Sequence, residues 1–518
     1  MGTEKQSKQG ARAPLPLAGF ADQQPSSLRP RLLIALSLLV FVTLGRVCTH
    51  EFVQWDDPQT IASNPAFNPP DFRAIATYWI HPAEALYVPL TYSVWGLLAY
   101  VAHVGTPDES GSMLNPWIYH TANLMIHLAA TIVVFLILRR LTKHDIAALV
   151  GAAVFAVHPV QVETVAWASG TKDLLCGLFI AASVYCWLLN RRKSGDAACY
   201  AFALLACLSK PTAIVIPFIL LVVDWMVRER RTFVRLWPVF GISIIVAIIA
   251  KCVQPPVLAD VPSVISRPLV ALDAISFYIA KLVWPAKLAL DYGRTPQVAL
   301  ASPLIRFCWV LPLIVAVIGW LSYRRLRLVS AGLLIALIGV APVLGLIPFT
   351  FQAYSTVADH YLYPSMIGVA MIVAWVIARF DGAVARSLAG VIVLVLATRS
   401  FFAAGDWRNS QTLFTHTLEV NPQSFGAYTN RGVDESHRHD ESAAEQDFRR
   451  AIAINPNYAF AHLDLAAHLK TRGDLDGAIS EYRQVQRIYQ SQRNFNPRLD
   501  EALNELIQSL ERSRRAPS

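Results

Sequence analysis

Two adjacent carboxylates, Asp56 and Asp57, follow the first long apolar run of the chain, in the stretch WDDPQTIASNP at 55–65. A carboxylate at this place is suited to act as a general base that takes a proton from a hydroxyl group. Adjacent side chains do not point the same way on a helix or a strand, so the pair is a poor clamp for a divalent metal. The alternative is structural, because an aspartate ahead of Pro58 can also cap a helix or a turn. We expect one aspartate to be the base and the other to position it.

Further polar and charged side chains stand in or beside the apolar segments, where each is costly unless it is paired or functional. Most of them are expected on the same side as the two aspartates, which indicates a single site on that side. Each one taken alone also fits a helix end at the water interface. The residues that we expect to line the site are His81, His158, Glu163, Asp173, Arg294, His360 and Tyr361.

Lys172 and Lys210 carry the opposite charge. A lysine at the end of a membrane helix ordinarily extends to the surface. Lys210 lies at the predicted tip of a short helical hairpin, which would hold its ammonium group below the level of the lipid headgroups. There it needs an anion, which the phosphate of a lipid-linked donor would supply. No G-x-x-x-x-G-K-[ST], C-x-x-C or H-E-x-x-H motif occurs. We therefore expect no nucleotide site and no required cofactor, with a divalent metal as the less favoured alternative, and an activated donor that lies within the membrane.

The elements that position these residues are apolar. Of the 518 residues, 54% are hydrophobic and 16% are charged, and the apolar residues form long blocks, which is typical of a polytopic membrane protein. The net charge of +9 comes from short Lys and Arg clusters between the blocks, so it indicates topology and argues against nucleic-acid binding. The seven cysteines, an odd number in or beside apolar segments, argue against a disulfide framework.

About eleven segments are predicted to cross the bilayer. They are 31–48, 117–138, 145–161, 165–189, 196–211, 212–227, 236–254, 305–323, 329–347, 360–379 and 384–402. With eleven spans, every basic cluster falls on the cytoplasmic side and the chain after Phe402 lies outside. Two further apolar stretches, 88–104 and 269–285, would break this agreement, so we predict that they are helices in the outer interface. Residues 1–30 are polar, Pro-rich and basic, and are predicted to be a disordered cytosolic tail before a retained first helix.

From Asp406 onwards the composition becomes that of a soluble domain. An Asn-Pro pair occurs at 421–422 and again at 455–456, and at the same spacing of 34 residues Ala427 aligns with Ala461. This is the period of tetratricopeptide repeats, which stack as an α-solenoid and bind extended peptides. A packing or dimerisation role is the alternative. The predicted elements are a half-repeat at 411–419, two full units and a capping helix near 494–513.

Six stretches of the chain are similar to motifs of a known family and occur in its order. They are WDDPQTIASNP (55–65), HPVQVETVAWASGTKDLL (158–175), LSKPTAIVIPF (208–218), FYIAKLVWPAKLALDY (277–292), ADHYLYPSMIG (358–368) and DWRNSQTLFTHTLEVNP (406–422). Together they resemble the transmembrane and tetratricopeptide-repeat O-mannosyltransferases and their bacterial relatives, which are polyprenyl-phosphate-sugar-dependent glycosyltransferases of the GT-C fold. The resemblance implies an all-α membrane bundle at 31–404 and an extracytoplasmic repeat domain at 405–518.

The family resemblance implies an inverting transfer of a sugar, typically mannose, from a polyprenyl phosphate to a Ser or Thr hydroxyl on the extracytoplasmic side. By that resemblance the base is an aspartate of the first outer loop, and we assign Asp56 as the base and Asp57 as its positioning residue. Lys172 and Lys210 are assigned to the donor phosphate. Relatives often carry Arg where this chain has Lys172, a change that keeps the charge and loses the two-pronged contact. The repeat array is shorter than in the eukaryotic members, and we expect a protein or peptide acceptor.

A different class of function is a non-catalytic membrane scaffold, which would recruit envelope or secretion partners through the repeats. In a scaffold, alanine at Asp56 and Asp57 would be silent and loss of 420–518 would be fatal. A transporter would place ionisable residues near the middle of its spans, where this chain has almost none. No N-x-[ST] sequence occurs, which favours a bacterial inner membrane, with the repeats in the periplasm, over the endoplasmic reticulum membrane.

Overall fold

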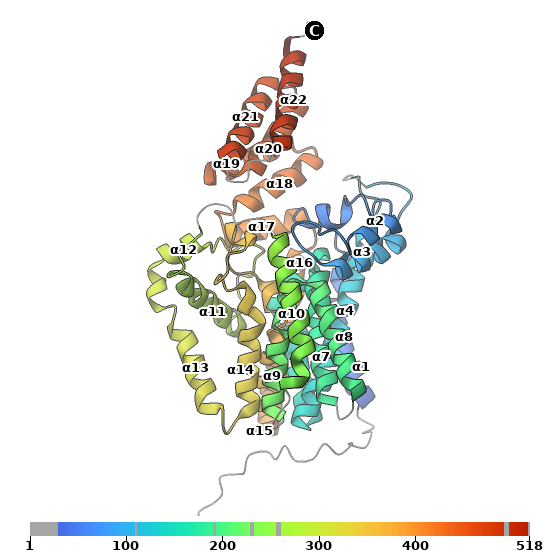
Figure 1. The fold of residues 1–518 in the computed structure, drawn as a ribbon, viewed down its shortest axis with the longest axis vertical. Coiled ribbons are helices and arrows are strands. Elements are labelled where there is room, and N and C mark those ends of the chain that lie inside the picture. Colours follow the sequence, from blue (N-terminus) through green and yellow to red (C-terminus); the bar gives the residue numbers. More distant parts are fainter. Residues whose placement is uncertain are drawn as a thin grey trace, which may run out of the picture.

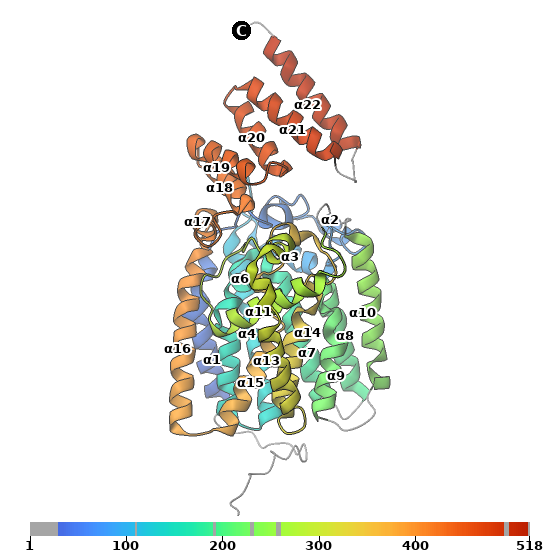
Figure 2. The ribbon, with the colours of Figure 1, turned by 90° about the vertical axis from the view of Figure 1, so that its left-hand side faces the viewer.

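The chain folds into a bundle of helices that carries a smaller set of C-terminal helices at one end (Figures 1 and 2). The computed structural model describes residues 29–108, 111–189, 193–227, 233–254, 261–491 and 497–515. These ranges are mostly helical and contain no β-strand, which confirms the all-α prediction. Most of the predicted tail at 1–30 and the basic residues at 191–192 and 228–231 lie outside the described residues.

Each of the eleven apolar segments predicted to cross the bilayer is helical. The helices are α1 (Arg29–Leu44), α4 (Pro116–Thr142), α5 (Asp145–Val157), α7 (Thr171–Leu189), α8 (Lys193–Ser209), α9 (Ile216–Val227), α10 (Phe233–Val253), α13 (Val310–Ser322), α14 (Arg327–Val340), α15 (Met366–Arg379) and α16 (Ala383–Asp406). Among the described residues, six helical stretches are long and apolar enough to cross a membrane, and α5 with α6 (Val162–Ala166) makes a seventh that is bent by 52°. The segments of α8, α9, α14 and α15 are shorter. The multi-pass arrangement is confirmed, and the count of eleven spans stays a prediction.

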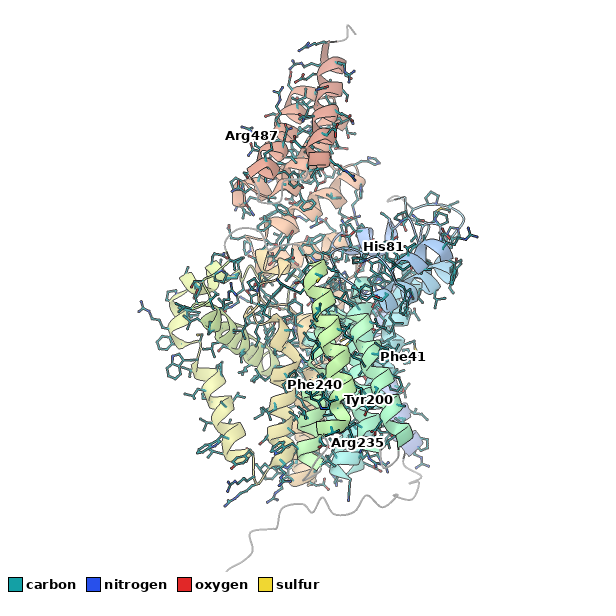
Figure 3. The ribbon with its side chains drawn as sticks, viewed as in Figure 1. Phe41, His81, Tyr200, Arg235, Phe240 and Arg487 are labelled. Atoms are coloured by element: carbon teal, nitrogen blue, oxygen red, sulfur yellow. The ribbon has the colours of Figure 1, made fainter. Side chains whose placement is uncertain are left out.

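The end of the bundle that lies away from the C-terminal helices gathers basic residues. Arg140 near the end of α4 donates to the carbonyl of Leu188 at the end of α7, and Asp196 in α8 pairs with Arg235 in α10. Arg235 lies toward this end of the bundle, whereas His81 lies at the end that carries the C-terminal helices (Figure 3). These basic residues therefore share one end, as the predicted topology requires.

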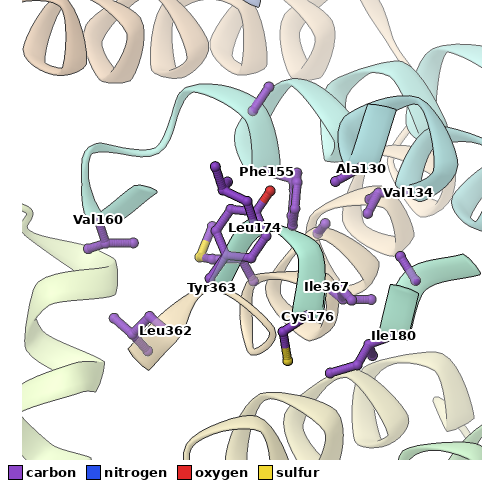
Figure 4. Close-up of a cluster of buried hydrophobic side chains, with 14 of the residues drawn as sticks. Ala130, Val134, Phe155, Val160, Leu174, Cys176, Ile180, Leu362, Tyr363 and Ile367 are labelled. Carbon is purple, nitrogen blue, oxygen red and sulfur yellow. The ribbon is translucent and has the colours of Figure 1, made fainter. Parts of the chain in front are cut away.

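The core formed by α4, α5, α7 and α15 sets the position of the turn that precedes α15. Phe155, Leu174 and Tyr363 are buried there among other apolar side chains (Figure 4). Gly177 lets Tyr363 pack against α7, because a Cβ at this glycine would lie 2.3 Å from the tyrosine ring. His127 Nδ1 lies 2.9 Å from the Tyr363 hydroxyl. The turn before α15 is thereby fixed close to the start of α7.

The two stretches predicted as interfacial helices form α3 (Pro89–Ala102) and α11 (Arg267–Val283). Both lie toward the end of the bundle that carries the C-terminal helices, together with the short α2 (Phe72–Thr77) and α12 (Pro296–Ala301) (Figure 1). Their placement in a membrane interface stays a prediction.

The C-terminal helices pack in sequence order, each against the next (Figure 2). They are α17 (Ser410–Val420), α18 (Phe425–His437), α19 (Glu441–Ile454), α20 (Ala459–Thr471), α21 (Leu475–Ser491) and α22 (Pro497–Arg515). Ala427 and Ala461, which align at the 34-residue period, are both fully buried. Asp440 and Asp474, which align at the same period, each accept a backbone amide hydrogen bond at the start of α19 and α21.

Candidate active site

Asp57 is fully buried, and both of its carboxylate oxygens accept hydrogen bonds. Oδ2 accepts from the Val53 amide at 3.0 Å, and Oδ1 accepts from the Ser169 amide at 2.9 Å and the Ser169 hydroxyl at 2.5 Å. Burial raises the pKa of Asp57 to about 6, although these three donors favour the ionised form. Asp57 therefore ties the loop after α1 to the turn in front of α7.

The turn in front of α7 is built by close backbone packing. A Cβ at Gly170 would lie 2.2 Å from the Thr164 carbonyl oxygen, so this turn needs a glycine. The Thr171 hydroxyl donates to the Asn123 side chain at 2.7 Å, which ties the start of α7 to α4. Lys172 stands in the first turn of α7, so the position of its stem is set by these contacts.

Asp56 has an environment opposite to that of Asp57. Its side chain is 40% exposed, and its Oδ2 lies 3.1 Å from Lys172 Nζ. Lys172 Nζ also lies 4.8 Å from the centre of the Trp167 ring, so the ammonium group contacts a carboxylate and an aromatic face. Asp56 is thus a carboxylate that a cation holds in place and that solvent can reach.

The second lysine lies between α8 and α9, at the predicted tip of the hairpin. Lys210 Nζ lies 2.5 Å from Asp173 Oδ1 and 5.5 Å from the centre of the Tyr361 ring. Asp173 follows Lys172 in α7, so the two ion pairs are neighbours. Both lysines are buried, which a cation tolerates only with an anionic partner.

The turn before α15 also contributes to the site, through Asp359 and His360. His360 donates from its amide to Glu163 at 3.0 Å, and its Nδ1 lies 2.8 Å from the same carboxylate. The Tyr292 hydroxyl lies 2.9 Å from each oxygen of Asp359 and donates to this carboxylate. Burial, followed by the nearness of Glu163, raises the pKa of Asp359 well above its ordinary value. These bonds hold the turn between α6 and the loop that follows α11.

The residues predicted for the site divide into two sets. The first set meets at the start of α7 and comprises Asp56, Asp57, Glu163, Lys172, Asp173, Lys210, His360 and Tyr361. His81 is exposed in the loop after α2 (Figure 3). His158 is buried and its Nε2 lies 3.1 Å from the Leu282 carbonyl oxygen, and Arg294 forms a two-pronged ion pair with Asp273 at 2.7 and 2.5 Å. These three form no hydrogen bond or ion pair with the first set in the described parts of the chain, and their place in the lining stays a prediction.

Three contributors were not among the predicted site residues, namely Trp167, Ser169 and Tyr292. Trp167 and Ser169 lie within the stretch that also holds Lys172, so their nearness to it is a signal that sequence reasoning could have used. Tyr292 ends the family-like stretch 277–292 and Asp359 lies in the stretch 358–368, but nothing in the sequence pairs these two residues, which are 67 positions apart. Within the described ranges, no three His, Cys, Asp or Glu side chains are grouped so that they could hold a metal ion.

Comparison with known proteins identifies sequence relatives of the chain. Residues 114–253, which run from α4 to α10, match the family described as dolichyl-phosphate-mannose-protein mannosyltransferase. A protein O-mannosyl-transferase of Caenorhabditis elegans is 24% identical over 463 residues, covering 82% of this chain and 63% of that protein. The protein O-mannosyl-transferase TMTC3 of Mus musculus is 23% identical over 413 residues, covering 69% of this chain and 44% of that protein. The chain thus spans less than two thirds of the length of both relatives.

Solved structures of an archaeal oligosaccharyltransferase match at low identity. The apo enzyme of Archaeoglobus fulgidus matches with a TM-score of 0.40 and 11% identity, over 79% of this chain and 59% of that one. The enzyme from the same organism in complex with an inhibitory peptide and a dolichol-phosphate matches with a TM-score of 0.39 and 12% identity, over 81% of this chain and 60% of that one. By its sequence matches, the chain is similar to protein O-mannosyl-transferases, TMTC3 among them.

Proposed function

We propose that the chain is an inverting glycosyltransferase that moves a sugar from a polyprenyl-phosphate donor to a Ser or Thr hydroxyl of a protein. The names of its sequence relatives support mannose as the sugar. One observation carries the proposal: Asp56 is exposed and paired with Lys172 at 3.1 Å, directly beside a buried Asp57 whose oxygens are already bonded. An exposed carboxylate in a fixed position next to buried cations is the arrangement that such a transfer needs.

Asp56 acts as the general base in this reaction. The acceptor oxygen attacks the anomeric carbon from the face opposite the phosphate while Asp56 takes the hydroxyl proton. The bond between the anomeric carbon and the phosphate oxygen breaks, the electron pair leaves with the polyprenyl phosphate, and the configuration at the anomeric carbon inverts.

Lys172 and Lys210 offset the charge that develops on the leaving phosphate. Each lysine is paired with a carboxylate, Lys172 with Asp56 and Lys210 with Asp173, so a phosphate bound to both lysines would share their charge with these carboxylates. A phosphate that draws Lys172 toward itself weakens the hold of Lys172 on Asp56. Donor binding would in this way release the base for the acceptor.

The remaining side chains position these groups. Asp57 holds the loop that carries Asp56, and the bond between His360 and Glu163 holds the turn that carries Tyr361 over Lys210. The proposed reaction uses no metal or organic cofactor.

We also propose that residues 31–404 form the glycosyltransferase domain and 405–518 a tetratricopeptide domain outside the membrane, in the periplasm of a bacterium. The 34-residue spacing of the Asn-Pro pairs and the burial of the aligned alanines, Ala427 and Ala461, support the repeat assignment. Arg140 and Arg235, which lie toward the opposite end of the bundle, support an extracytoplasmic position for the tail.

The test is transfer by the purified full chain in lipid nanodiscs, with a labelled polyprenyl-phosphate mannose and a Ser/Thr peptide. We expect a glycopeptide whose anomeric configuration is opposite to that of the donor. A product with retained configuration, or no transfer from any polyprenyl-phosphate sugar, would overturn the proposal.

A further inference from the structure

Five aromatic side chains form a row from the loop after α1 to the C-terminal helices. In order they are Trp55, Tyr354, Phe425, Tyr458 and Phe460, and neighbouring ring centres are 5.5, 5.3, 4.7 and 5.7 Å apart. A hydrogen bond of 3.0 Å also joins the hydroxyls of Tyr354 and Tyr458. Phe460 is exposed, and the other four residues are half-buried. We call this row the aromatic strip.

The strip begins at the proposed base. Trp55 precedes Asp56 in the chain, and the Asp56 carboxylate lies close enough to Tyr354 to act on its hydroxyl electrostatically. A molecule that lies along the strip would therefore reach the carboxylate at one end. This continuity separates the strip from an aromatic cluster that only fastens two groups of helices together.

The strip ends on α20 in an exposed phenylalanine. Phe460 is 54% exposed, and among the described residues of 405–518 the only other exposed large hydrophobic side chain is Leu499, at 37%. Asp464 stands one helical turn beyond Phe460 on the same face of α20. Its carboxylate has no hydrogen bond or ion pair with any residue that the structure describes, and it lies close enough to Tyr458 and Tyr482 to act on them electrostatically.

We infer that the aromatic strip is the track on which an extended polypeptide acceptor lies, with a basic side chain of that polypeptide at Asp464. The inference rests on the proposed function and names the chemistry of its acceptor. A negative charge beside aromatic rings is the environment that a Lys or Arg side chain prefers. Burial raises the pKa of Asp464 to about 7, as expected for a carboxylate without a cation, and a bound ammonium group would remove that penalty.

The packing of the rings favours a polypeptide over a glycan. Tyr354 and Phe425 stack on each other with an interplanar angle of 28°, and the Trp55 ring stands edge-on to Tyr354. The stacked rings thus cover part of one another's faces and the two hydroxyls bond to each other, so ring edges are left for an acceptor, and these suit apolar side chains. A sugar ring needs an open aromatic face.

The length of the strip sets the number of residues between the modified Ser or Thr and the basic residue of the acceptor. Tyr354 and Tyr458 also contact each other directly at 6.1 Å, so the steps of 5.5, 6.1 and 5.7 Å give the strip a length of at most about 17 Å, the reach of about five extended residues. Asp464 adds one helical turn, so the basic residue should lie about six to eight residues from the modified Ser or Thr.

The test is peptide binding to the full chain in nanodiscs without donor, measured by fluorescence anisotropy. The probe is a labelled peptide of about twelve residues, with alternating Val, one Thr and one Lys about seven residues away. A matched probe carries Glu in place of Lys. We expect wild type to prefer the Lys peptide, Phe460→Ala to raise Kd for it about tenfold, and Asp464→Lys to reverse the preference. Leu499→Ala, the matched exposed hydrophobic side chain, should bind as wild type does.

Equal binding of both peptides by wild type, or a Phe460→Ala variant within twofold of wild type, would overturn the inference. Thermal unfolding of each variant checks that the tail remains folded. Binding without donor separates this inference from the proposed function. Peptide binding with no sugar transfer would sink the function alone, and transfer that Phe460→Ala and Asp464→Lys leave unchanged would sink the acceptor track alone.

Discussion

Asp57 accepts two hydrogen bonds from Ser169, from its amide at 2.9 Å and its hydroxyl at 2.5 Å, although the two residues are 112 positions apart. Asp56, its neighbour, is paired with Lys172 and stays exposed. Successive side chains leave the backbone in different directions, so one aspartate reaches inward while the other faces solvent. The two carboxylates therefore differ in what they can do: Asp57 holds the loop, and Asp56 is available to a substrate.

Replacement of Asp57 should destabilise the fold and also slow sugar transfer. Asp57→Ala leaves the amides of Val53 and Ser169 buried without their acceptor, which we expect to cost about 2 to 4 kcal/mol. A lower midpoint of thermal unfolding in detergent checks this. Asp71→Ala, which removes an exposed helix cap in the same loop, should cost only about 1 kcal/mol. If Asp57→Ala unfolds at the wild-type temperature, Asp57 does not hold the loop.

Lys172 should act mainly on the donor. Loss of one charge-assisted contact to phosphate in Lys172→Gln should raise the donor KM about tenfold to a hundredfold. Lys172→Arg keeps the charge, adds a two-pronged donor and should retain activity. Initial rates at varied donor concentration test both variants, with the exposed Lys470→Gln as control. An unchanged KM in Lys172→Gln would remove this lysine from the phosphate site.

Binding of a basic peptide should weaken as the pH falls. Burial raises the pKa of Asp464 to about 7, and a cation binds only the ionised carboxylate. Affinity should therefore be full above about pH 8 and fall by at most about tenfold per pH unit below 7. Asp464→Asn should make the affinity independent of pH between about pH 6 and 8, which is about one unit on either side of the pKa. Fluorescence anisotropy at each pH measures this affinity. The same slope in Asp464→Asn would assign the titration to another group.

Transfer should not depend on a divalent metal. The described residues hold no group of three metal-ligating side chains, and the proposed mechanism offsets the phosphate charge with two lysines. We expect the initial rate to survive treatment with EDTA. Loss of activity that Mg²⁺ or Mn²⁺ restores would show that a metal shares this task.

Much of the bundle could be predicted because its signals are local. Long apolar runs form helices, so each predicted segment corresponds to a helix. The break at Lys210 was predictable from Pro211, which starts a new turn after α8. The helices of the tail followed from the 34-residue period.

The site was harder to predict because its contacts are between distant residues. Nothing near Asp56 and Asp57 says which one Ser169 will bind, since that depends on how α7 packs against the loop. Arg294 lies in the loop after α11, and its partner Asp273 lies within that helix, 21 residues earlier, so the pairing had no local signal. His81 was predicted to line the site, but its side chain is exposed in the loop after α2.

The most direct test of the account is the single-turnover rate of sugar transfer by Asp56→Asn, with donor binding measured on the same sample. Loss of the general base should slow transfer at least about a hundredfold while the donor still binds and the thermal unfolding midpoint is unchanged. A wild-type rate in Asp56→Asn would contradict the assignment of Asp56 as the base.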